Sequence, residues 1–323
     1  MDVAPVAQSG PALDISAIVG IISAIAAALS AGFAFWPLWI QRRTQRLLEA
    51  EFGSELYMPE VLDRSTRYYI RPKGSSVDPG TESEMRNVVT AEQDLFELLD
   101  KFLSKDSSDR HLILLADSGM GKSSCLLNYY VRNQRKAPRK RHRVAIVPLG
   151  NAKADEYIAS VPEKQRTCLF LDAFDEDTKA ITDHRARLGT LMSLCEAFRR
   201  VVITCRTQFF AKDEEIPQET GIVRFEPRKA GETGTYRFKK VYLSPFDDEM
   251  VDIFLRKRYP IWRYSERRQA RKVVRSIPLL SVRPMLLAFM PDLIASGESI
   301  RTSFELYDCL VASWLDRESR WVS

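Results

Sequence analysis

The chain has 323 residues, 45% of them hydrophobic and 28% charged, which is enough apolar material to build one large domain or two. Its formal net charge is +5. Residues 1 to 40 contain two aspartates and no lysine or arginine, so the rest of the chain carries a formal charge of +7. Five single cysteines and three isolated histidines have no metal-ligand spacing, which argues against a structural zinc site and predicts reduced, buried thiols.

The first predicted element is an uncharged stretch from Ile15 to Ile40. As a helix it would be about 39 Å long, enough to cross a hydrocarbon core of about 30 Å. A cleaved signal peptide is excluded because a basic leading region is missing. Arg42, Arg43 and Arg46 follow the span, and positive residues stay on the cytoplasmic side. We therefore expect a single-pass protein of the cell inner membrane, with residues 1–14 outside and the body in the cytoplasm.

Small residues recur at every fourth position of this span, which would allow two such helices to pack closely in the lipid bilayer. They are Ser16, Gly20, Ala24, Ala28 and Gly32. However, 12 of the 26 residues are Gly, Ala or Ser, so a stripe of this kind also arises by chance. Self-association through the span and a chance pattern both remain open.

Residues 41–88 are predicted to form a connector, with a helix after the span, a short strand at 66–70 and a linker at 71–83. Thr90 and Gln93 have the spacing of a capping box that opens a helix. The apolar face of that helix would be formed by Leu95, Leu98, Leu99, Phe102 and Leu103.

A buried strand at 112–116 runs directly into a glycine-bearing loop and a helix, the context that a phosphate-binding loop requires. Gly119 and Gly121 permit backbone conformations that aim successive N–H groups at an anion, Lys122 would reach the β- and γ-phosphates, and Ser123 would ligate Mg²⁺. The alternative is an ordinary strand–turn–helix with a chance Gly-Lys-Ser. The candidate nucleotide-binding residues are Ala116, Asp117, Ser118, Gly119, Met120, Gly121, Lys122, Ser123 and Ser124.

Further apolar runs at 144–149, 167–172, 201–205 and 241–243 alternate with helical stretches. This alternation predicts an α/β fold, a parallel sheet covered by helices on both faces. In such a sheet ligands bind beyond the carboxyl ends of the strands, so the polar residues that end each run are the candidate site.

One of these runs ends in four acids within six residues, Asp172, Asp175, Glu176 and Asp177, whose repulsion a cation would relieve. We expect Asp172 to hold Mg²⁺ through water, and Glu176 or Asp175 to orient or deprotonate the attacking water. Alternatively, the acids cap a helix and remain solvated. The next run ends near Arg206, which would either sense the γ-phosphate or only pair with the acids.

Four stretches in this order resemble the NACHT-type NTPases of the STAND class, which include NOD-like receptors and bacterial antiviral sensors. They are ADSGMGKSS, CLFLDAFDED, VVITCRTQ and YLSPFDDEMVDIFLRKRYP. The resemblance covers roughly residues 90 to 320. It implies a P-loop NTPase sheet at 89–245, followed by a helical subdomain at 246–323 in which Pro284 lies against the bound base. A helix-breaking role for Pro284 is equally open from the residues alone.

The resemblance also implies a slow, regulatory ATPase that binds ATP and Mg²⁺ and forms a homo-oligomer when activated. The sequence has no Asn-Lys-x-Asp motif for reading guanine, which favours ATP over GTP. Family members continue into a winged-helix domain and a sensor of repeats, so we expect a fragment or a short form whose trigger ligand is unknown.

Two basic runs, 132–143 and 256–275, could contact anionic lipid or nucleic acid. Solvated surfaces are the favoured interpretation, because aromatic residues are sparse between the charges and no nucleic-acid-binding fold is visible. The expected function is a membrane-anchored ATP switch in bacterial antiphage defence or stress signalling. The alternative is a scaffold at the membrane that binds nucleotide without hydrolysing it.

Overall fold

The computed structural model describes residues 39–53, 55–76, 92–209, 222–225, 236–276 and 283–295, with 304, 305, 308 and 311. The chain divides into two units, 1–47 and 48–323; in the first, residues 39–47 are helical. Among the described residues no helix is long and apolar enough to cross a membrane. All but the last two residues of the predicted span, 15–40, lie outside the described part of the chain.

The described part of the second unit contains an eight-stranded sheet in the order β2-β1-β8-β3-β6-β5-β4, with β7 paired to β8. The strands are β1 Lys73–Ser75, β2 Gln93–Asp94, β3 His111–Leu115, β4 Arg143–Pro148, β5 Thr167–Asp172, β6 Arg200–Cys205, β7 Ile222–Phe225 and β8 Tyr236–Leu243. Strands β8, β3, β6, β5 and β4 are parallel, whereas β1, β2 and β7 pair antiparallel. The α/β prediction is confirmed, and the sheet is mixed rather than wholly parallel.

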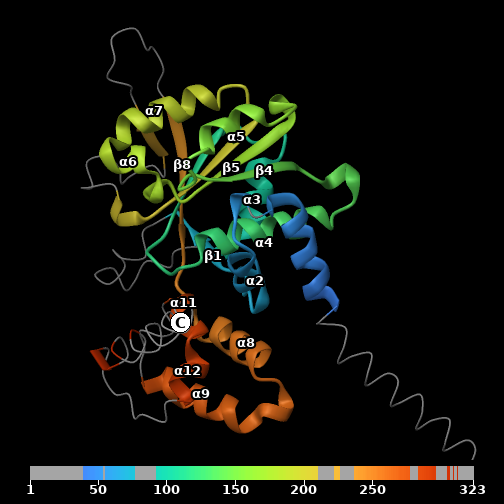
Figure 1. Ribbon diagram of the computed structural model, residues 1–323, viewed down its shortest axis with the longest axis vertical. Helices are drawn as coiled ribbons and strands as arrows, with labels where there is room; N and C mark the ends of the chain where they lie inside the picture. The colour runs from blue at the N-terminus through green and yellow to red at the C-terminus, as the bar shows by residue number, and fades with distance from the viewer. Residues whose placement is uncertain are drawn as a thin grey trace, which may run out of the picture. The chain divides into compact units, whose positions relative to one another are not determined.

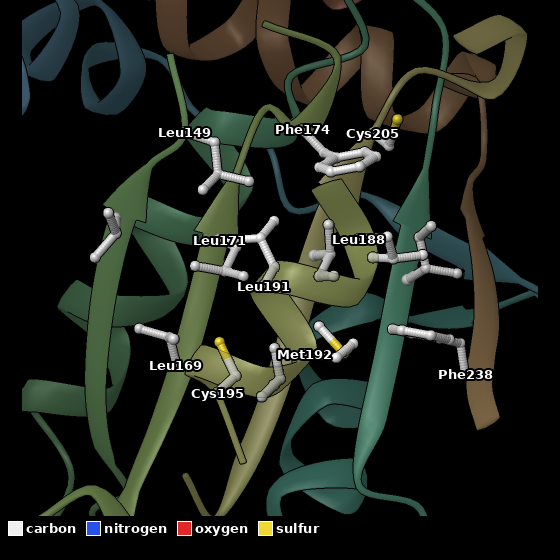
Figure 2. Close-up of a cluster of buried hydrophobic side chains, with 14 of the residues drawn as sticks. Leu149, Leu169, Leu171, Phe174, Leu188, Leu191, Met192, Cys195, Cys205 and Phe238 are labelled. Atoms are coloured by element: carbon white, nitrogen blue, oxygen red, sulfur yellow. The ribbon is translucent and has the colours of Figure 1, made fainter. Parts of the chain in front are cut away.

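Helices cover both faces of the sheet, which explains why the central strands are buried along almost their whole length and consist mainly of apolar residues. Helices α3 Leu95–Leu103 and α4 Lys122–Gln134 lie on one side, and α5 Ala154–Ser160, α6 Thr178–Thr182 and α7 His184–Leu194 lie on the other (Figure 1). Successive side chains of β5 point alternately to the two layers of helices, because side chains alternate between the faces of a sheet. Phe170 meets Tyr129 of α4 with ring centroids 5.7 Å apart, whereas Leu169 and Leu171 face Leu191 of α7 (Figure 2).

A second hydrophobic cluster lies among the helices that follow the sheet. They are α8 Asp248–Arg258, α9 Tyr264–Ser276, α11 Pro284–Ala288 and α12 Met290–Ala295. Ile70 from the connector belongs to the same cluster, and Lys257 donates a hydrogen bond to the carbonyl of Tyr69 at 2.8 Å. The predicted boundary between 245 and 246 falls between the end of β8 and the start of α8.

Three local predictions before the loop are wrong. The expected strand at 66–70 is the end of helix α2 Pro59–Arg67 and the turn after it. The expected linker at 71–83 contains β1, which pairs with β2 and β8. Helix α3 is capped by Asp94, whose carboxylate accepts from the N–H groups of Phe96 and Glu97, whereas Gln93 lies in β2. The short side chain of Asp94, directly before the first turn, therefore caps the helix in place of the expected Thr90–Gln93 box.

Four of the five cysteines, Cys125, Cys168, Cys195 and Cys205, are free and buried, as the sequence predicts. The fifth, Cys309, lies outside the described residues. Burial raises the pKa of the Cys168 thiol to about 11, which keeps it protonated and unreactive.

His111 opens β3 in an apolar setting, 8% exposed and with its ring 5.3 Å from that of Phe238. Burial, and secondarily the positive charge of Arg110, lowers the pKa of His111 from 6.5 to about 4. The unfolded chain therefore binds this proton below pH 6.5 and the folded chain does not, so stability falls with pH from 6.5 towards 4. The contribution lost from this one group at pH 5 is about 2 kcal/mol.

We expect His111→Phe to lose less stability than the parent between pH 7 and pH 5, by about 2 kcal/mol. Urea unfolding of both proteins at the two pH values measures the difference. An equal loss in the variant and the parent would contradict the assignment.

Candidate active site

The glycine-bearing loop joins β3, in the middle of the parallel strands, to α4. Gly119 and Gly121 have φ of 79° and 87°, a left-handed region that residues with a Cβ seldom adopt. Gly121 is the N-cap of α4 and supplies no side-chain cap. The first N–H groups of this 13-residue helix therefore have no intrahelical acceptor, and with the helix dipole they favour an anion at the loop.

Lys122, the first residue of α4, folds back over the loop. Its Nζ donates to the carbonyl oxygens of Ala116 at 2.7 Å and Asp117 at 3.2 Å. Burial lowers the pKa of Lys122, against the attraction of nearby Asp175. Lys122 makes no ion pair within the described ranges, and two neutral carbonyls are its acceptors. A cation held in this way is available to an incoming phosphate.

Asp172 ends β5 beside the loop and is 2% exposed. Its Oδ1 accepts a hydrogen bond from Thr204 Oγ1 at 2.7 Å and its Oδ2 accepts from Tyr57 Oη at 2.9 Å. Burial raises the pKa of Asp172, and hydrogen bonds from Ser123, Thr204 and Tyr57 partly lower it. The structure thus brings together Ser123 and Asp172, the two predicted magnesium ligands.

The acids after Asp172 separate into different roles. Ala173, with φ of 59°, turns the chain into a short 3-10 helix at Phe174–Glu176. The Asp175 side chain is 4% exposed. Its Oδ2 lies 2.7 Å from Arg206 Nε, and its Oδ1 accepts from the Arg206 backbone N–H at 3.0 Å. The Glu176 side chain is 59% exposed, and its Oε1 lies 3.8 Å from Arg206 Nη2. Partial burial, and then the charges of Asp175 and Asp172, raise the pKa of Glu176.

Asp177 is separate from the other acids in function. It caps α6 by accepting from the N–H of Lys179, and its Oδ2 lies 2.6 Å from Arg187 Nε. Arg187 also contacts Asp155 at 2.6 Å. Two arginines therefore pair with two of the four acids, and two hydroxyl groups donate to a third, so part of the expected repulsion is relieved by the protein itself. Asp177 caps a helix as the alternative expected, but its side chain is buried rather than solvated, and Arg206 pairs with Asp175.

We expect Arg187→Ala to lower the free energy of unfolding by about 3–5 kcal/mol, because it leaves the carboxylate of Asp177 buried without a partner. The matched control is Lys179→Ala. The Lys179 side chain is 59% exposed and pairs with the same Asp155 at 2.6 Å, so its loss should cost about 1 kcal/mol or less. Urea unfolding measures both, and equal effects would contradict the assignment.

Pro284 is the first residue of α11, a position where proline starts a helix rather than breaking it. The next residue reaches the loop: the Met285 N–H donates to the carbonyl of Gly119 at 3.1 Å. A Cβ on Gly119 would lie 3.1 Å from the Met285 Cβ. The predicted base-binding segment and the predicted phosphate-binding loop are therefore in direct contact.

The residues present fit a nucleotide with a hydrated cation. The loop offers N–H groups and the Lys122 ammonium for phosphate, while Ser123 and Asp172 offer oxygen ligands. Within the described ranges no three His, Cys, Asp or Glu residues gather as a metal site of their own. Mg²⁺ usually keeps several waters and takes other ligands from phosphate, so it needs few ligands from the protein.

Tyr57 and Thr204 are the contacts of Asp172 to which the sequence assigns no role. Thr204 could have been found as the polar residue near the carboxyl end of a buried strand, next to the run that ends in Asp172. Tyr57 lies 115 residues from Asp172 in the chain, and no motif connects the two.

No protein-family model matches the chain, and no curated protein matches it. Among solved structures it is similar to a single-site variant of RuvB from Thermotoga maritima, at 9% sequence identity and a TM-score of 0.31. That match covers 73% of this chain and 70% of RuvB. A superposition this loose assigns no role to any residue of the chain.

Proposed function

We propose that the chain is a P-loop NTPase that binds and slowly hydrolyses ATP. The observation that carries the proposal is the geometry of one edge of the sheet. There Lys122 lies over a loop with two left-handed glycines, and Ser123 at the start of α4 lies near the buried Asp172 that ends β5. The mostly parallel sheet with helices on both faces fits a P-loop NTPase.

Each residue has a role in this proposal. The loop 116–121 and the start of α4 bind the phosphates through backbone N–H groups, and Lys122 exchanges its two carbonyl acceptors for phosphate oxygens. Ser123 and Asp172 hold Mg²⁺, Asp172 through water. When bound, the ion neutralises charge that develops on the phosphates. Glu176 is exposed and accepts the proton of the attacking water.

Asp175 and Arg206 form a closed pair in the structure. We propose that Asp175 fixes the position of Arg206 rather than acting on water itself. Arg206 then meets the γ-phosphate only if its contact with Asp175 opens or if the γ-phosphate approaches its exposed side; the arginine side chain is 47% exposed. Pro284 is proposed to contact the base, supported by the contact of Met285 with Gly119.

The wider proposal is a membrane-anchored switch of the NACHT and STAND kind. The support is the order of the four motifs and the apolar stretch 15–40, together with the arginines that follow it. Activation would join copies of the chain into a homo-oligomer at the inner membrane, in antiphage defence or stress signalling. Nucleic acid is not a proposed partner: several charges of the two basic runs are already paired, among them Arg132 with Asp100 and Arg271 with Asp252.

The experiment is phosphate release by the full chain in lipid nanodiscs, with ATP and GTP each in excess Mg²⁺. We expect slow release from ATP and less from GTP. ATP binding without release would favour the scaffold at the membrane. Absence of both binding and release would contradict the proposal.

A further inference from the structure

The predicted connector between the membrane span and the sheet reaches the candidate metal site. Tyr57 lies between the helix that ends near residue 56 and α2, and it is 7% exposed. Its phenol donates to Oδ2 of Asp172 at 2.9 Å. Thr204 of β6 donates to Oδ1 of the same carboxylate at 2.7 Å. Two donors from distant parts of the chain therefore fix the plane of one carboxylate.

Neighbouring contacts fix the position of Tyr57 itself. The ring of Phe52 meets that of Tyr57 edge to face, with centroids 5.9 Å apart. On the sheet side, Asn151 Nδ2 donates to the carbonyl of Glu55 at 2.7 Å. Further along the segment, Asn128 Nδ2 donates at 2.9 Å to the carbonyl of Ser65. The connector is held by residues that follow β4 and by the loop helix α4, on both sides of the phenol.

Asn128 also ties this segment to the phosphate-binding end of α4. The same Nδ2 donates to the carbonyl of Ser124 at 2.7 Å, and Ser124 follows the proposed metal ligand Ser123. The connector thus contacts both elements that supply the proposed ligands, α4 through Asn128 and the end of β5 through Asp172.

We propose that Tyr57 is a positioning residue for the metal bound with ATP, and that through it the connector forms part of the nucleotide site. This inference rests on the proposed function. Groups that hydrogen-bond a metal ligand from outside orient it and tune its affinity, and their loss typically costs 10–100-fold in metal affinity. The phenol and the Thr204 hydroxyl hold the Asp172 carboxylate in one orientation before the ion arrives.

A consequence for regulation follows from linkage. If docking of residues 55–67 strengthens Mg²⁺-dependent ATP binding, then bound MgATP must strengthen docking of the same segment by an equal factor. The nucleotide state is thereby communicated to the segment that leads to the predicted membrane span.

The test uses the full chain in lipid nanodiscs and the variant Tyr57→Phe, which keeps the ring and removes the hydroxyl. A fluorescent ATP analogue is titrated first in EDTA and then at increasing Mg²⁺. We expect the affinity of the variant for the analogue in EDTA to stay within about twofold of that of the parent. The Mg²⁺ concentration that gives half of the maximal increase in affinity should rise about tenfold or more. Hydrogen exchange of residues 55–67 should slow with MgATP in the parent and less so in the variant.

Tyr157→Phe is the matched control. Tyr157 donates to Glu55 of the same segment at 2.8 Å, so this variant removes a hydroxyl that touches the connector without touching Asp172. Its Mg²⁺ dependence should match the parent. Thr204→Val is a second variant that removes the other donor to Asp172, and it should raise the Mg²⁺ requirement in the same direction.

The outcomes separate the two proposals. A parent that binds no ATP with or without Mg²⁺ overturns the proposed function. A parent that binds ATP, with an unchanged Mg²⁺ dependence in Tyr57→Phe, overturns this inference alone. An equal loss of affinity in EDTA and in Mg²⁺, together with a lower melting temperature, shows that the phenol only supports the fold and also overturns it.

Discussion

Lys122→Ala is expected to abolish ATP binding. The ammonium lies at the loop, 2.7 Å and 3.2 Å from two backbone carbonyls, and no carboxylate competes for it within an ion-pair distance among the described residues. Phosphate would exchange those neutral acceptors for charged ones, which makes stronger hydrogen bonds. Without the ammonium, the loop keeps its N–H groups and loses its fixed positive charge.

The measurement is the shift in stability on adding ATP. At a hundredfold excess over Kd, ATP should stabilise the parent by about 2.7 kcal/mol and leave Lys122→Ala unchanged. Lys136→Ala is the matched control, because Lys136 follows the same helix and pairs with Asp100 at 2.6 Å. It should keep the full shift. A full shift in Lys122→Ala would contradict the assignment of the loop.

Glu176→Gln is expected to slow ATP hydrolysis by about 10²–10⁴-fold while leaving ATP bound, because an amide cannot accept the proton of the attacking water. The structure favours Glu176 over Asp175 for this role. The Asp175 side chain is 4% exposed and forms an ion pair with Arg206 at 2.7 Å, whereas the Glu176 side chain is 59% exposed. The raised pKa of Glu176, from partial burial and two neighbouring carboxylates, makes it a better proton acceptor than an ordinary glutamate.

Single-turnover phosphate release measures the rate, and the ATP-induced stability shift measures binding in the same samples. The control is Glu156→Gln, a change at an exposed acid of α5 that should leave the rate as in the parent. A parent-like rate in Glu176→Gln would show that another group accepts the proton. A lost ATP shift would show that Glu176 serves binding instead.

The sheet and the loop could be predicted from sequence because their signals are local. Uninterrupted apolar runs at 112–115 and 168–171 admit few alternatives when helices cover both faces. Glycines that need left-handed φ, followed by Lys-Ser, fix the turn between β3 and α4 within a few residues. No distant contact is needed to recognise either feature.

The errors have two causes, strand pairing with distant segments and the choice of a helix cap among neighbouring polar residues. Residues 73–75 form a strand because β8 and β2 offer partners, although the segment itself resembles a linker. Several neighbouring polar residues could cap α3, and Asp94, directly before the first turn, does so in place of the expected Thr90–Gln93 box. Neither strand pairing nor the choice of a cap leaves a clear trace in the local sequence pattern.

The acidic cluster is the most instructive case. Four acids near a buried strand suggest a metal ion, but Arg187 and Arg206 neutralise two of them from other elements. Only Asp172 remains beside the loop with hydroxyl donors alone, and one of those donors is Tyr57. Charge density in the sequence therefore locates the edge of the sheet that matters, and the position of Asp172 at the end of the strand singles it out, but the partners of the other acids come from distant elements.

Photocrosslinking with 8-azido-ATP tests the central claim most directly, namely that nucleotide binds between the loop at 116–124 and the segment that begins at Pro284. The full chain is labelled in Mg²⁺, digested, and the labelled peptides are identified by mass spectrometry. We predict label in peptides that contain the loop or residues 283–289, lost on adding excess ATP and absent in Lys122→Ala. Label confined to other parts of the chain, or label that excess ATP does not displace, would contradict the account.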